Sequence, residues 1–114
     1  MRFNSQQDWH NYLTSRQQNP LTGNELFDLR KDCYTEIEKL RGCPLLIYAT
    51  KFLDNQPGVA NNIDLTDVEG FIDLVNSIEN AEEIDVLLHS PGGRPDATER
   101  IVHILRERFT RVNF

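Results

Sequence analysis

A strand that runs straight into a Pro-Gly-Gly turn is the part of this sequence best suited to chemistry. Two successive glycines permit positive φ and let the backbone approach a bound group without side-chain obstruction. A helix is expected directly afterwards, so its free N–H groups and the positive end of its dipole would point at the same place. This is the chemistry of an anion or oxyanion cradle, although Pro-Gly-Gly alone also occurs in ordinary turns. The segment consists of Leu87, Leu88, His89, Ser90, Pro91, Gly92 and Gly93.

A catalytic triad made from His89, Ser90 and a nearby aspartate is not expected. His89 and Ser90 are adjacent, and adjacent side chains of a continuing strand point to opposite faces. A nucleophile and its base must lie within about 2.6–3.2 Å of each other, which this geometry opposes. We therefore expect Ser90 to shape the turn and His89 to point into a groove or into the core.

Three short segments predict β-strands. Leu45–Thr50 and Ile84–Leu88 are apolar runs too short for independent helices. Thr110–Phe114 alternates polar and apolar residues, as the beginning of a third strand does. Because helices are expected between these segments, the strands should be parallel and joined by crossovers. The fold class is therefore α/β, with a parallel β-α-β-α-β unit over residues 43–114.

Four helices are expected around these strands. Two of them, over Gln6–Gln18 and Asn24–Arg41, precede the first strand and form an N-terminal helical segment over residues 1–42. The third follows Thr66–Glu69, whose Thr-x-x-Glu pattern is typical of a capping box. The fourth begins at Pro95, a residue that suits the first turn of a helix.

Composition limits the possible partners of the chain. The 114 residues suffice for one compact domain, and the net charge of −6 argues against a uniformly basic nucleic-acid grip. The longest apolar stretch, Pro44–Ala49, is far shorter than the roughly 18 residues that span a bilayer. The first eight residues lack the apolar core of a signal peptide. We expect a cytoplasmic protein with no nucleic-acid partner and no membrane span.

The cysteines and histidines do not predict a metal site or a cofactor. Cys33 falls on the apolar stripe of a predicted helix, and Cys43 lies at the entry to a strand. Free cysteine behaves as a small buried hydrophobe in such places, and reduced thiols suit the cytosol. His10 and His103 have no second ligand at metal-binding spacing. Both cysteines are therefore interpreted as structural thiols.

The region around the Pro-Gly-Gly turn resembles a known family. Ile84–Gly93, followed by Ala97–Arg106, resembles the Clp-protease/crotonase superfamily. Within it, the likeness is to Clp-like serine peptidases of the serine dehydrogenase proteinase group and to signal peptide peptidase A relatives. The resemblance begins near Cys43 and extends to the end of the sequence, so it covers the segment that predicts the α/β unit.

The resemblance implies an oxyanion hole. In those peptidases the second glycine of the element donates its backbone N–H to the oxyanion of the tetrahedral intermediate. The matching residue here is Gly93, and Gly92 shapes the turn. The residues just before them, His89, Ser90 and Pro91, would then contact the substrate, and the loop Lys51–Asn62 would border the substrate groove.

The resemblance also implies what the 114 residues do not contain. The catalytic serine of the family follows the next strand, and its lysine or histidine base lies further on, beyond Phe114. We therefore expect the front part of a Clp-like serine peptidase, inactive alone, which takes a peptide or protein substrate and forms a homo-oligomer. The alternative is a non-catalytic Clp-like binding or assembly module, since an edge strand exposes unpaired backbone groups.

Overall fold

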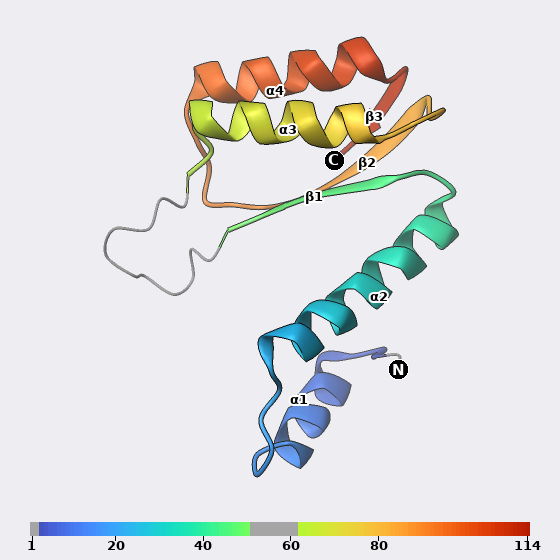
Figure 1. Ribbon diagram of the computed structural model, residues 1–114, viewed down its shortest axis with the longest axis vertical. Coiled ribbons are helices and arrows are strands. Elements are labelled where there is room, and N and C mark those ends of the chain that lie inside the picture. Colours follow the sequence, from blue (N-terminus) through green and yellow to red (C-terminus); the bar gives the residue numbers. More distant parts are fainter. Residues whose placement is uncertain (1–2, 51–61) are drawn as a thin grey trace. The chain divides into compact units, whose positions relative to one another are not determined.

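The computed structural model describes residues 3–50 and 62–114. The chain divides into two compact units, Met1–Arg41 and Gly42–Phe114 (Figure 1). In the described ranges, no helix is both long enough and apolar enough to cross a bilayer.

The first unit contains helices α1 (Gln6–Ser15) and α2 (Gly23–Arg41). The predicted first helix extended to Gln18, but the chain leaves the helix at Arg16. The Arg16 side chain donates to the backbone oxygen of Asn19 at 2.8 Å and forms an ion pair with Glu25 at 3.0 Å. These contacts connect the end of α1 to the first turn of α2.

The second unit is a parallel α/β layer. It contains β1 (Leu45–Ala49), α3 (Leu65–Ser77), β2 (Glu83–His89), α4 (Pro95–Arg108) and β3 (Arg111–Asn113). The sheet order is β1-β2-β3, with parallel pairing on both sides of β2. The predicted alternation of strands and helices, and the parallel direction of the strands, are confirmed.

One face of the sheet carries the apolar core. Ile84 and Leu105 are its two largest fully buried side chains, so β2 and α4 meet at its centre. Figure 1 shows α3 and α4 on the same side of the sheet. The remaining core side chains come from all five elements or their ends: Leu46, Ile63, Phe71, Val75, Val86, Ala97, Ile101 and Phe109 are buried, and Val112 of β3 packs against them.

The face of β2 away from the core carries Glu83, Asp85, Leu87 and His89, so polar side chains predominate on it. Ile84 and Val86 point into the core, while Glu83, Asp85 and His89 occupy the alternate positions. Residues that can do chemistry therefore lie at both ends of one central strand.

The capping box predicted at Thr66–Glu69 is wrong. The helix begins earlier, with Asp64 as N-cap: its side chain accepts from the backbone N–H of Thr66, and the Asp67 carboxylate accepts from the N–H of Asp64. The hydroxyl and N–H of Thr66 hold the pKa of the Asp64 carboxyl below its ordinary value. Thr66 is thus already helical and cannot serve as the cap.

Replacing Asp64 with alanine should therefore destabilise the protein, whereas replacing Glu69 with alanine should not. Loss of an N-cap of this kind is expected to lower the Tm by roughly 4 °C, because the N–H of Thr66 loses its acceptor. Circular-dichroism melts of Asp64→Ala and Glu69→Ala measure both effects. A larger loss in Glu69→Ala would restore the capping box that the sequence suggested.

Candidate oxyanion turn at the end of strand β2

The turn after β2 is closed by its own serine. The Ser90 hydroxyl donates to the backbone oxygen of Gly92 at 2.9 Å and accepts from the N–H of Gly92 at 3.2 Å. Serine hydroxyls commonly stabilise turns in this way. Ser90 therefore shapes the turn, as the sequence predicts, and its oxygen is engaged by the backbone two residues further on.

The two glycines are needed for different reasons. Gly92 has a φ of +131°, a conformation that side chains with a Cβ rarely adopt, although the space around it is open. Gly93 is required by close contact instead. A Cβ built on Gly93 would lie 2.4 Å from the Cβ of Ile63 and 2.7 Å from its backbone oxygen.

Ile63 approaches so closely because it forms a parallel bridge with Gly93. The N–H of Ile63 donates to the oxygen of Gly92 at 3.0 Å, and the N–H of Arg94 donates to the oxygen of Ile63 at 2.9 Å. In parallel pairing, the residue between two such bonds directs its own N–H and C=O to the opposite side. The N–H of Gly93 therefore faces away from Ile63, and no acceptor for it is found in residues 3–50 or 62–114.

The beginning of α4 lies directly after this turn. Pro95 occupies its first turn, and the N-cap, Arg94, makes no side-chain capping bond. Asp96 accepts from the N–H of Ala97 at 3.0 Å and pairs with Arg94 at 2.8 Å. Desolvation raises the pKa of Asp96, but the bonds from Arg94 and Ala97 outweigh it and leave the pKa below its ordinary value. Asp96 thus already uses part of the positive helix end, and the outward donor is the glycine.

A tyrosine near the carboxyl end of β1 is hydrogen-bonded to α3. The Tyr48 hydroxyl donates to Oδ2 of Asp67 at 3.0 Å, the same carboxylate oxygen that accepts from the N–H of Asp64. Desolvation and the Asp67 contact raise the pKa of Tyr48 to about 12. Tyr48 is therefore protonated at neutral pH and acts as a hydrogen-bond donor, not as a base.

The remaining predicted site residues are His89 and Pro91. His89 is exposed, which excludes the core as the place of its side chain, while its place in a substrate groove stays a prediction. The reason is the alternation of β2, which places His89 on the face opposite Ile84. Its backbone oxygen accepts from the N–H of Thr50 at 2.8 Å and extends the pairing of β1 and β2. Pro91 is exposed on the turn.

One residue that matters here, Ile63, was missed by the sequence analysis. Ile63 forms the backbone bridge to Gly93. Asp67 provides the carboxylate that accepts from both Tyr48 and Asp64. An apolar residue before Asp-x-x-Asp is a sequence signal for the helix start, but nothing in the spacing reveals that Ile63 meets Gly93. The predicted loop Lys51–Asn62 lies outside the described residues, apart from Asn62.

Comparisons with known proteins add no identification. No family model, curated protein or solved structure matches the chain.

Because Gly93 touches the backbone of Ile63, its replacement by alanine should be costly, whereas a helical glycine should tolerate the same change. We expect Gly93→Ala to lose roughly 1–3 kcal/mol of unfolding free energy, or more if the bridge breaks. Gly70, in α3, has open space around it, so Gly70→Ala should gain about 0.5–1 kcal/mol. Urea unfolding of the pair measures both. Equal stability of Gly93→Ala and the unaltered chain would contradict the close contact.

Proposed function

We propose that this chain supplies the oxyanion-binding turn of a Clp-like serine peptidase domain. The observation that carries the proposal is the outward N–H of Gly93, placed at the carboxyl end of the central parallel strand by the Ile63 bridge. Ligands of open parallel sheets bind at the carboxyl ends of the strands. The resemblance of residues 84–106 to the Clp-like serine peptidases supports the same assignment.

In this role Gly93 acts on the carbonyl oxygen of the scissile peptide bond. When a serine attacks the carbonyl carbon, negative charge develops on that oxygen, and a fixed N–H stabilises the charge without reorganising. One such donor contributes about 2.7–4 kcal/mol to the transition state. The resemblance implies that a second donor is the N–H that follows the nucleophile. The glycine at 93 suits this task because no side chain stands between its N–H and the substrate.

None of the residues of the turn is assigned as nucleophile or base. Ser90 is held by both of its bonds to Gly92, and His89 is its neighbour on the opposite face of the strand. Tyr48 remains protonated. The proposed contribution of the chain is therefore positioning and charge stabilisation, and the attacking serine belongs to a segment outside residues 1–114.

A non-catalytic binding or assembly module is the second candidate. It is favoured by the sheet itself, in which β1 and β3 are the two outer strands. Such edges can pair with another chain. In this reading the Gly-Gly turn shapes the end of the sheet and contacts a peptide without cleaving it.

A fluorophosphonate probe, which labels activated serines, separates the two candidates. The chain of 114 residues should not be labelled, and Ser90→Ala should give the same blank result. The native gene product, purified from its own cells, should exceed 13.2 kDa and carry the label on a serine outside residues 1–114.

Three outcomes would contradict the peptidase proposal. Labelling of the 114-residue chain that Ser90→Ala abolishes would give the chain its own nucleophile. A native product of 13.2 kDa without label would favour the binding module. A longer product that the probe leaves unlabelled would also exclude an activated serine.

A further inference from the structure

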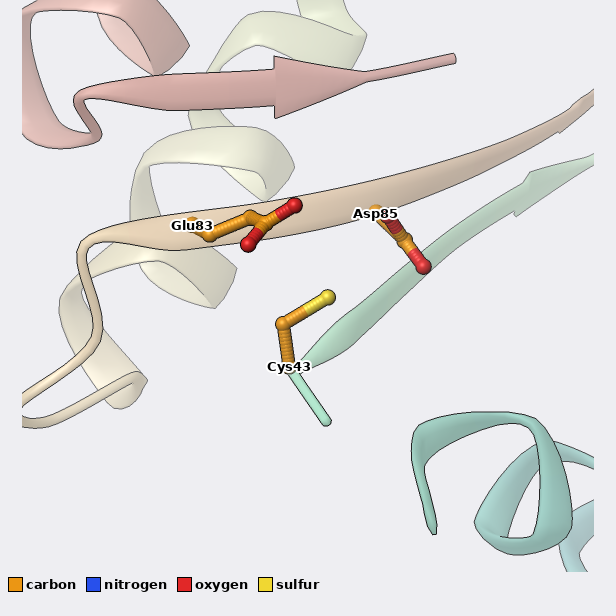
Figure 2. A group of neighbouring side chains, drawn as sticks. All are labelled: Cys43, Glu83 and Asp85. Atoms are coloured by element: carbon orange, nitrogen blue, oxygen red, sulfur yellow. The ribbon is translucent and has the colours of Figure 1, made fainter. Parts of the chain in front are cut away.

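A second group of reactive side chains lies at the other end of the sheet. Cys43 lies two residues before β1, while Glu83 and Asp85 belong to the first half of β2, so all three are remote from the turn after His89. Each of the three offers a ligand atom, and these atoms all lie within 4.8 Å of one another. Figure 2 shows the sulfur of Cys43 directed toward the two carboxylates.

Negative charge is costly in the surroundings of this group. Cys43 is 9% exposed and Asp85 is 8% exposed, and Glu83 is half-buried. Carboxylates that approach each other away from water repel, and desolvation adds to the cost of their charges. This differs from a group of acidic side chains on an open surface, where water screens the charges.

An amide from the third strand orients both carboxylates. The Nδ2 of Asn113 donates to Oε1 of Glu83 at 2.9 Å and to Oδ1 of Asp85 at 2.8 Å. The amide holds the two carboxylates side by side, and the guanidinium of Arg111 lies 4.0 Å from Oε2 of Glu83. Hydrogen-bonded partners of this kind usually hold the ligands of metal ions in place.

The group is also reachable from solvent. A hollow of about 530 Å³ is lined by Cys43 and Glu83 together with residues at the end of the α3–β2 connection. An ion could enter by this route, and water could reach an open coordination position.

We propose that Cys43, Glu83 and Asp85 bind one divalent cation of the zinc class. A thiolate favours zinc over magnesium or calcium, which prefer oxygen ligands alone. Zinc binds sulfur at about 2.3 Å and carboxylate oxygen at about 2.0–2.2 Å, so tetrahedral ligand atoms lie roughly 3.3–3.7 Å apart. The three ligand atoms, which lie within 4.8 Å of one another, would close to that separation when the ion binds.

Three protein ligands leave the fourth position of a tetrahedral ion to water. The Cys43 thiol gives its proton to solvent when its sulfur binds the ion. The bound ion joins the start of β1 to β2 and, through Asn113, to β3. The sequence predicts no metal site because Cys43 and Glu83 are 40 positions apart and only the pairing of β1 with β2 brings them together.

The test is to titrate Zn²⁺ into the untagged 114-residue chain in metal-free buffer and to measure binding by isothermal titration calorimetry. We expect one Zn²⁺ per chain. Cys43→Ser should weaken binding at least tenfold, and Asn113→Ala should weaken it about 10–100-fold, as loss of an orienting partner does. Cys33→Ser, the matched control on α2, should bind as the unaltered chain does. Absence of saturable binding, or equal effects of Cys43→Ser and Cys33→Ser, would overturn the site.

A measurement on the unaltered chain avoids any effect of the variants on folding. With Zn²⁺ present, alkylation of Cys43 should slow at least tenfold, while alkylation of Cys33 should be unchanged, as mass spectrometry of the modified peptides reports. Equal rates for Cys43 with and without Zn²⁺ would also overturn the site. Neither result depends on the role proposed for Gly93, because the two sites lie at opposite ends of the sheet.

Discussion

The approach of Gly93 to the backbone of Ile63 is the contact on which the candidate site depends. The two hydrogen bonds of this bridge, at 3.0 and 2.9 Å, involve the residues on either side of Gly93. They leave the N–H of Gly93 itself directed outward. They also bring the segment before α3 against the segment before α4, so one contact sets the starting points of both helices. Any side chain at position 93 would separate these segments.

The strand before this bridge is anchored in the core by its first half. Ile84 and Leu105 are fully buried, and Phe71, Ala97 and Phe109 surround them, so β2 is held between the other strands and the two helices. A donor attached to such a strand keeps its direction when charge develops on a bound oxygen. Glu83 and Asp85 lie near the amino end of the same strand, on its other face, and Asn113 holds their carboxylates in place. One central element thus positions two chemically different groups at its two ends.

The elements of the fold were predictable because each depends on local pattern. The apolar run at Leu45, the helix start at Pro95 and the parallel order of the strands follow from periodicity, backbone restriction and crossover geometry. The turn that the Ser90 hydroxyl closes also depends on local sequence. The capping box was misplaced by two residues because Asp64 and Thr66 both suit an N-cap, and only the entry of the chain from Ile63 selects the first.

What the sequence could not reveal is contact between distant segments. Gly93 contacts Ile63, which lies thirty residues earlier in the sequence. Cys43 lies close to Glu83 because β1 and β2 are neighbours in the sheet. No spacing rule relates these positions, since their separation depends on the length of the connection between the strands. His89 shows the same limit: choosing between a groove and the core for its side chain requires knowing which face of β2 the helices cover.

Amide hydrogen exchange at Ile63, Gly93 and Arg94 tests the central claim most directly. In a uniformly ¹⁵N-labelled chain, the amides of Ile63 and Arg94 should be protected by the bridge, while the amide of Gly93 between them should exchange rapidly. This pattern of two slow amides around a fast one is specific to an outward-facing donor. Protection of the Gly93 amide equal to that of its neighbours would mean that its N–H is already used within the protein, and it would remove the oxyanion turn from the account.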